Sequence, residues 1–116
     1  MMKRLLIMSA GLMVALASPA FSSEPLYINP SSVTVRVRQE ATIRLIPQGR
    51  HSVSWDVSRG YCYSRQMASA HIHGWQREHG YYFFPVTISG MYPGHCEMFF
   101  KSTSGAEAKL SVFVER

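Results

Sequence analysis

The chain has 116 residues, 47% of them hydrophobic and 16% charged, and a formal net charge of +5 at pH 7. This length suffices for one domain and no more. The charge includes Lys3 and Arg4, which lie in a segment we expect to be removed; without them ten basic residues face seven acidic ones, a charge of +3. The remaining arginines are spread along the chain, which argues against a nucleic-acid-binding protein.

Residues 1–20 have the pattern of a secretory signal peptide. A short positive region is followed by the mostly apolar segment 5–17, and small residues at 18–20, or alternatively at 20–22, offer a cleavage site. The apolar segment is well short of the roughly 20 residues that a transmembrane helix needs. We therefore expect a periplasmic or secreted protein with no transmembrane anchor after cleavage and a single domain over residues 24–116.

After this leader, apolar and polar residues alternate with period two in four segments: 33–38, 41–45, 53–58 and 108–115. Such alternation is typical of half-buried β-strands. Turn-forming residues separate the segments, at 29–30, 47–49, 59–60, 89–90, 93–94 and 102–105. Short strands at roughly ten-residue spacing predict an all-β fold, a small antiparallel β-sandwich.

Residues 64–79 give the weakest local signal. Segment 67–73 fits either a strand or a helical turn, and segment 75–78 resembles a loop.

Cys62 and Cys96 are the only cysteines. In an oxidising compartment such a pair predicts a disulfide, and two residues allow only one intramolecular pairing. Closing a loop of about 35 residues should contribute about 4 kcal/mol in the chain-entropy treatment.

Several segments resemble parts of bacterial immunoglobulin-like (Ig-like) domains. Residues 28–35 resemble the opening strand of these domains, residues 53–55 the strand that carries their Trp, and residues 89–100 and 108–114 their last two strands. The resemblance implies an Ig-like β-sandwich with a structural or adhesive role. The chain departs from the antibody pattern because Cys62 follows Trp55, and because Tyr92 lies four residues before Cys96 instead of two. The exact topology therefore stays open.

The segment YPGHCEM, residues 92–98, brings together the residue types of a blue-copper site: His95, Cys96 and Met98. In a strand, however, Cys96 and Met98 face one side and His95 the other. Cys96 also has a competing partner in Cys62. The pattern therefore favours a disulfide-linked strand over a copper centre.

A second metal hypothesis involves His71 and His73, which would share one strand face with Cα atoms about 7 Å apart. Both could bind Zn²⁺ or Cu²⁺, with His79 as a third ligand. The alternative is a set of solvated histidines, in which case no cofactor is expected.

Catalysis is not expected. Asp56 is the only Asp, and no Ser or Cys lies in a recognisable nucleophile motif. The informative residues are instead aromatic side chains that strand alternation or loops would leave exposed, since exposed aromatics near arginines make good contact surfaces. The candidate partner-binding residues are Phe99, Phe113, Tyr61, Tyr63, Trp75, Tyr81 and Tyr82. The alternative is that the 64–79 segment or a second layer covers these rings.

The sequence thus predicts an exported, non-catalytic binding or structural module with a protein or envelope partner. Two alternatives are a periplasmic Zn- or Cu-binding protein and a small secreted enzyme inhibitor.

Overall fold

The computed structural model describes residues 25–116, so the predicted signal peptide lies outside the described residues. These residues form the strands β1 (Leu26–Asn29), β2 (Ser32–Arg36), β3 (Glu40–Pro47), β4 (Val53–Trp55), β5 (Ala68–Ile72), β6 (Gln76–Glu78), β7 (Tyr81–Gly90), β8 (Gly94–Ser102) and β9 (Glu107–Glu115). Within this part of the chain no helix is long and apolar enough to cross a membrane.

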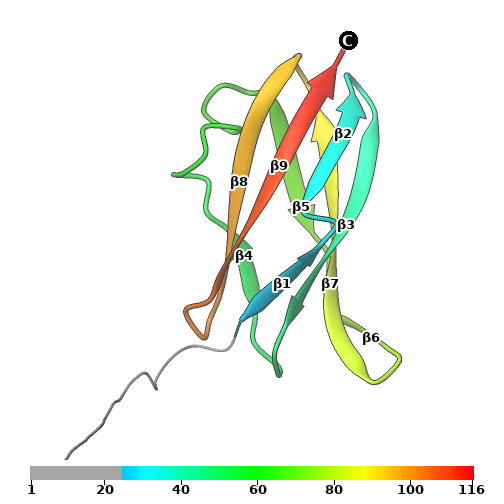
Figure 1. Ribbon diagram of the computed structural model, residues 1–116, viewed down its shortest axis with the longest axis vertical. Helices are drawn as coiled ribbons and strands as arrows, with labels where there is room; N and C mark the ends of the chain where they lie inside the picture. The colour runs from blue at the N-terminus through cyan, green and yellow to red at the C-terminus, as the bar shows by residue number, and fades with distance from the viewer. Residues whose placement is uncertain (1–24) are drawn as a thin grey trace, which may run out of the picture.

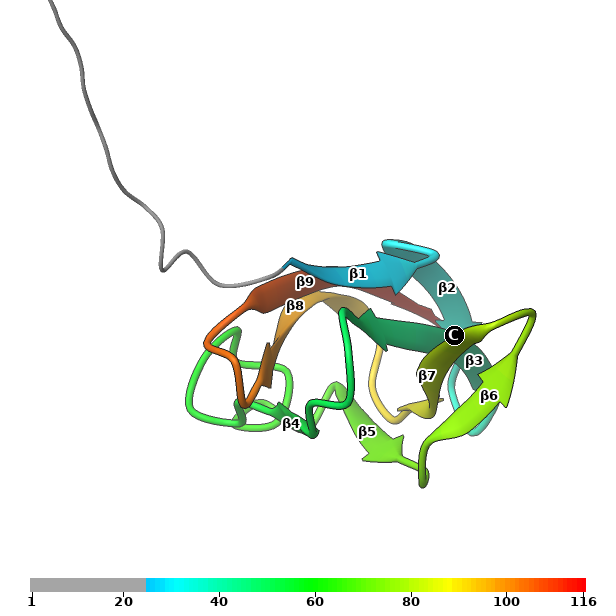
Figure 2. The same ribbon diagram turned by 90° about the horizontal axis from the view of Figure 1, so that it is seen from below.

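The strands form two sheets that pack face to face (Figures 1 and 2). One sheet has the order β1-β3-β7-β5, with β6 also paired to β7, and the other has the order β2-β9-β8-β4. If β1 and β2 are counted as two halves of the first strand and β6 as an insertion, this is the arrangement of a seven-stranded immunoglobulin sandwich. The predicted fold class is confirmed.

The first strand is divided between the two sheets. β1 pairs antiparallel with β3, whereas β2 pairs parallel with β9. The chain crosses between the sheets at Pro30, which lacks an N–H group and cannot continue a ladder of hydrogen bonds. The resemblance to a single opening strand over 28–35 therefore covers two structural elements.

The core lies between the sheets and consists of the alternating apolar residues of the long strands. The largest side chains that are fully buried are Phe100, Ile43, Leu45, Ile88, Met98, Leu110, Val86 and Val112. The period-two pattern thus identified the inward faces of β2, β3 and β9 correctly.

The predicted disulfide joins Cys62 and Cys96, with a Cα–Cα distance of 5.2 Å. Both cysteines are fully buried. Cys62 lies in the long β4–β5 loop and Cys96 near the start of β8, so the bond fastens this loop to the sheet. The neighbouring Tyr61 also forms a bridge with Glu97 of β8.

Several local expectations were wrong. The strand expected over 53–58 ends at Trp55, because Asp56 accepts hydrogen bonds from the backbone and hydroxyl of Ser58, which turns the chain. Residues 76–78, expected as loop, form β6. Gly90, expected in a turn, belongs to β7; a Cβ there would lie 2.7 Å from the Arg36 carbonyl oxygen, so glycine permits this close packing.

Candidate functional site

Three connections meet at the lower end of the sandwich in Figure 1. They are the β3–β4 loop (residues 48–52), the β5–β7 connection that contains β6 (73–80), and the β8–β9 loop (103–106). The backbone N–H of Thr103 donates to the carbonyl of Ser52, at 2.9 Å, and ties two of these loops together. In antibody variable domains the corresponding end carries the binding loops.

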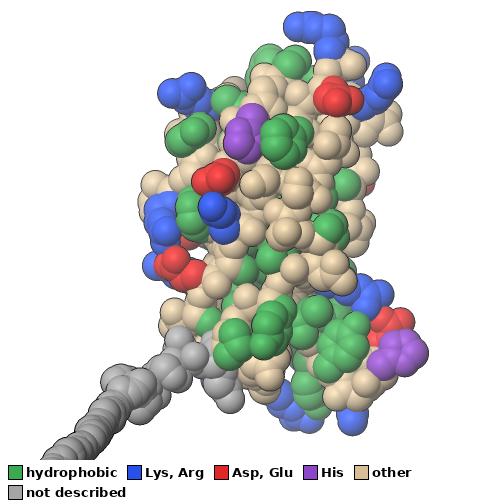
Figure 3. All heavy atoms as spheres, in the orientation of Figure 1, with side chains coloured by type: hydrophobic (Ala, Val, Ile, Leu, Met, Phe, Trp, Pro, Cys, Tyr) green, Lys and Arg blue, Asp and Glu red, His purple; other side chains and the backbone are tan. Residues whose placement is uncertain are grey.

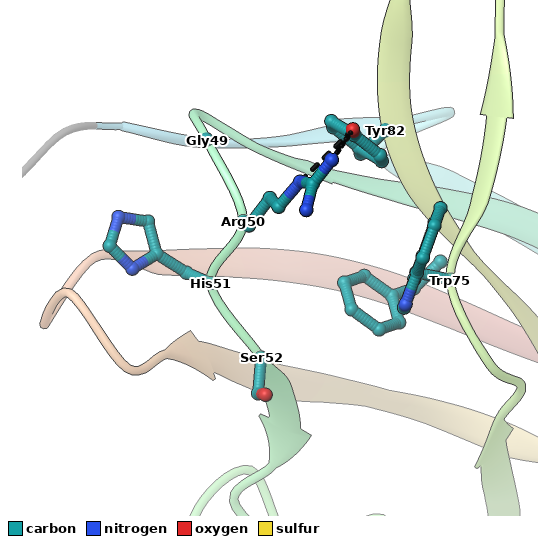
Figure 4. A pocket seen from close by; sticks show the side chains of 7 residues that line it. Gly49, Arg50, His51, Ser52, Trp75 and Tyr82 are labelled. Carbon is teal, nitrogen blue, oxygen red and sulfur yellow. Dashed lines mark hydrogen bonds between the residues drawn. The ribbon is translucent and has the colours of Figure 1, made fainter.

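This loop end contains a pocket of about 190 Å³, drawn in Figure 4. Its lining residues come from the β3–β4 loop, from the connection before β6 and from β7: Gly49, Arg50, His51, Ser52, Trp75, Tyr82 and Phe84. Tyr82 and Phe84 are half-buried, whereas the Trp75 side chain is 57% exposed. The pocket is thus built from aromatic rings, and Trp75 presents its ring to solvent.

Tyr82 holds the pocket together. Its hydroxyl oxygen accepts hydrogen bonds from Nε of Arg50, at 3.0 Å, and from a terminal nitrogen of the same guanidinium, at 2.5 Å. Trp75 packs edge-on against Tyr82, with ring centroids 5.0 Å apart and planes at 74°. The loop residue Arg50 and the strand residue Tyr82 therefore fix the surface against which Trp75 rests.

Two arginines lie over the ring of Tyr82: Arg50, which lines this pocket, and Arg77 of β6, which lines a neighbouring pocket with Arg44 and Glu78. The guanidinium carbons of Arg50 and Arg77 lie 4.9 Å and 5.6 Å from the centroid of Tyr82. Within residues 25–116 neither arginine forms an ion pair with a carboxylate. The pocket therefore combines exposed aromatic surface with one arginine, Arg50, that has no carboxylate partner among the described residues.

The position of β6 depends on a cluster on the outer face of the same sheet. Arg44 pairs with Glu78 of β6 at 2.5 Å and lies over the ring of Phe83, 4.1 Å from its centroid. The hydrogen bond with Glu78 raises the pKa of Arg44, and a second bond to Tyr81 acts in the same direction. Tyr81 and Phe83 are two positions apart on β7 and share its outer face. Phe83 is nevertheless buried, because Arg44 and β6 cover it.

Tyr61 and Tyr63 are exposed in the β4–β5 loop, on either side of Cys62. Tyr63 packs edge-on against Trp55, at 5.9 Å between centroids, and the Arg65 guanidinium lies 5.0 Å from the ring centroid of Tyr61. Because Cys96 precedes the end of β8 by six residues, this loop is fastened to the sheet about 20 Å from the loop end. The predicted partner-binding residues Tyr61 and Tyr63 therefore lie in a different region from Trp75 and Tyr82.

The outer face of β8 and β9 carries the remaining predicted rings. Phe113 is 41% exposed and stacks on His95, with centroids 4.4 Å apart. Phe99 is half-buried and not fully exposed, because the guanidinium of Arg59 lies 4.1 Å from the centroid of its ring. In Figure 3 hydrophobic side chains on this face are interspersed with charged ones, whereas more of them gather at the lower end of the molecule.

Comparisons with known proteins identify the fold. No protein-family model matches the sequence, and no curated protein matches it. Among solved structures, the chain is similar to domains 4 and 5 of the S-layer protein SbsC, with a TM-score of 0.59, 20% identity, and coverage of 89% of this chain and 56% of that one. This is an immunoglobulin-like β-sandwich.

Two further SbsC structures match in the same way. Domains 1–6 give a TM-score of 0.58 at 20% identity, with 88% of this chain and 14% of that chain covered. Domains 5–6 give 0.57 at 21% identity, with 79% and 43% covered. The chain thus spans about half or less of these multidomain structures.

The histidines of the predicted metal site are only partly brought together in this Ig-like domain. The rings of His71 and His73 lie 4.6 Å apart, and Nε2 of His73 is 2.8 Å from the Thr87 hydroxyl. His79 lies in the turn after β6, about 20 Å further along β7 by ladder position. Among residues 25–116 no group of three potential ligands forms. The structure thus places His71 and His73 side by side and His79 apart from them.

The sequence alone did not identify Arg50 as a site residue. It is one of many dispersed arginines, and nothing in the local pattern connects it with Tyr82, 32 positions later. Trp75 and Tyr82 were among the predicted partner-binding residues because aromatic residues beside loops stand out. The turn residues at 47–49 mark a loop but do not show which strand that loop contacts.

Proposed function

We propose that residues 24–116 form one exported, non-catalytic binding module whose contact surface is the pocket at the loop end. The observation that carries this proposal is Trp75, more than half exposed yet supported from beneath by Tyr82 and, through it, by Arg50. Trp, Tyr and Arg are the residues most enriched among energetically dominant contacts. A ring held in place before binding loses little conformational entropy when a partner covers it.

The polar residues of the pocket suit recognition better than catalysis. His51 and Ser52 are neighbours in the chain, but Figure 4 shows their side chains diverging, with His51 directed away from Trp75. Nδ1 of His51 lies 3.5 Å from the Thr103 hydroxyl, in the adjacent loop. Cys62 and Cys96 are bonded to each other, so neither provides a thiol.

The similarity to domains of an S-layer protein supports the exported part of the proposal. It agrees with the signal-peptide pattern of residues 1–20 and with the predicted disulfide, which is typical of oxidising compartments. The partner class we propose is a component of the cell envelope or surface.

The test measures binding of the purified, unreduced domain to isolated cell envelopes from its own source. Trp75→Ala should weaken binding at least tenfold. Phe113→Ala is the matched control, because it removes an exposed ring on the outer face of β9, and it should leave binding unchanged. Equal binding by the Trp75→Ala variant and the unaltered domain would contradict the proposal.

A further inference from the structure

We infer that the pocket at the loop end binds an acidic saccharide, meaning a sugar ring that carries a carboxylate. This inference rests on the proposed function, since it names the ligand class of the same site. Three properties of the pocket carry it: the shape of its aromatic surface, its size, and the state of its arginines.

The two aromatic rings of the pocket lie nearly perpendicular to each other. Trp75 and Tyr82 meet at 74° with centroids 5.0 Å apart, so two ring planes border one space. The face of an aromatic ring is electron-rich, and the C–H groups of a sugar ring, which carry partial positive charge, pack well against it. The 57% exposure of Trp75 leaves ring surface available for such packing.

The pocket volume of about 190 Å³ is below the 300–1,000 Å³ typical of sites for drug-sized ligands. A pocket of this size accommodates one sugar-sized ring and not the contact surface of a folded protein. Protein partners usually bury about 800 Å² on each side, with an apolar centre. Here the aromatic centre is narrow and Arg50 borders it, which favours the end or one unit of a glycan.

The arginines give the pocket its charge preference. Five arginines in the described residues lie over aromatic rings. Arg44 and Arg59, over phenylalanines, each pair with a glutamate, at 2.5 Å and 2.6 Å. Arg50 and Arg77, both over Tyr82, and Arg65, over Tyr61, pair with no carboxylate in residues 25–116.

Arg50 retains donors for a ligand. Nε and one terminal nitrogen donate to Tyr82, whereas the other terminal nitrogen makes no hydrogen bond within residues 25–116. A guanidinium binds a carboxylate in a planar, bidentate geometry that a neutral hydroxyl group cannot match. Arg77 lies over the same tyrosine, outside the pocket lining, and adds positive charge nearby, so the pocket favours a negatively charged ring.

The experiment uses short oligogalacturonides and their methyl esters, which share the same sugar rings but differ in charge. The chain has two tryptophans, so ¹⁹F-labelled tryptophan gives two signals, one from Trp75 in the pocket and one from Trp55, which does not line it. Oligogalacturonide should shift the Trp75 signal and leave the Trp55 signal in place. The methyl ester should bind at least tenfold more weakly.

Arginine variants provide the matched comparison. Arg50→Gln and Arg77→Gln should each weaken oligogalacturonide binding at least tenfold, and Arg65→Gln, which alters an arginine over Tyr61 in the β4–β5 loop, should not. Equal binding of acid and ester, or no shift at Trp75, would overturn the inference. An oligoglutamate peptide that shifts Trp75 where the saccharide does not would assign the pocket to an acidic protein segment instead. In both cases envelope binding that still depends on Trp75 would leave the proposed function intact.

Discussion

The hydroxyl oxygen of Tyr82 on β7 accepts two hydrogen bonds from Arg50 in the β3–β4 loop. This relationship positions Trp75, because Trp75 rests edge-on against the Tyr82 ring.

Tyr82→Phe removes the acceptor and keeps the ring. We expect it to lower the free energy of unfolding by only about 1 kcal/mol, since the bonds are exposed, while binding to envelopes falls severalfold.

Urea unfolding and the envelope assay check this expectation for Tyr82→Phe. Tyr27→Phe is the control, because Tyr27 is 53% exposed on β1 and does not line the pocket. Unchanged binding by Tyr82→Phe would show that the hydrogen bonds from Arg50 do not support the contact surface.

Substituting Phe99 should lower the free energy of unfolding more than substituting Phe113, although both side chains point outward. Phe113→Ser removes a ring that is 41% exposed and should change the free energy of unfolding by less than about 1 kcal/mol. Phe99→Ser removes a ring packed between Arg59 and the backbone near Gly60, and should cost about 1–2 kcal/mol. Chemical denaturation measures both values, and equal losses would contradict the structure.

Asp56 should titrate below the usual range of an aspartate. The hydrogen bond from the Ser58 hydroxyl is the main cause of its lowered pKa, and Lys101 acts in the same direction. Because the folded pKa lies below the unfolded value of about 3.9, the ionised carboxylate stabilises the fold above that pH. This contribution is lost as the pH falls through the folded pKa.

Carboxyl ¹³C NMR measures this titration directly, since Asp56 is the only aspartate in the chain. Ser58→Ala should raise the pKa of Asp56 toward its ordinary value. Lys101→Gln should raise the pKa less. A midpoint that stays the same in Ser58→Ala would contradict the assigned cause.

Zn²⁺ or Cu²⁺ should bind weakly, through His71 and His73 alone. Two imidazoles supply half of the four ligands of a closed zinc site, and their rings are 4.6 Å apart. Titration calorimetry should show at least tenfold weaker binding in His71→Ala. His79→Ala is the control, and an equal loss in that variant would restore the three-histidine arrangement.

Much of the fold was predictable from the sequence. Strand alternation can be read from neighbouring residues, and two cysteines allow only one intramolecular pairing. Val33 and Val35, for example, identify the inward face of β2 without knowledge of its partner. The division of the first strand at Pro30 and the short strand β6 were not predictable, since both depend on which sheet accepts the segment. β6 forms because Arg44 binds Glu78 over Phe83, a contact between residues 34 positions apart.

The candidate site was predictable only in its aromatic part. Trp75 and Tyr82 are conspicuous by residue type, but the partnership of Tyr82 with Arg50 arises because the β3–β4 loop packs against the start of β7. Conversely, Phe99 appeared free by alternation, and the loop residue Arg59 covers it. In each case a contact from a loop residue far away in the sequence decides whether an aromatic ring is exposed to a partner.

Photocrosslinking tests the central claim, that the loop end is the contact surface, most directly. A benzophenone amino acid placed at position 75, or at position 113 as the control, reacts with C–H groups of whatever lies against it, protein or glycan. On isolated envelopes, position 75 should give one dominant adduct that excess unlabelled domain suppresses, and position 113 should give none. Adducts from position 113 with none from position 75 would contradict the account.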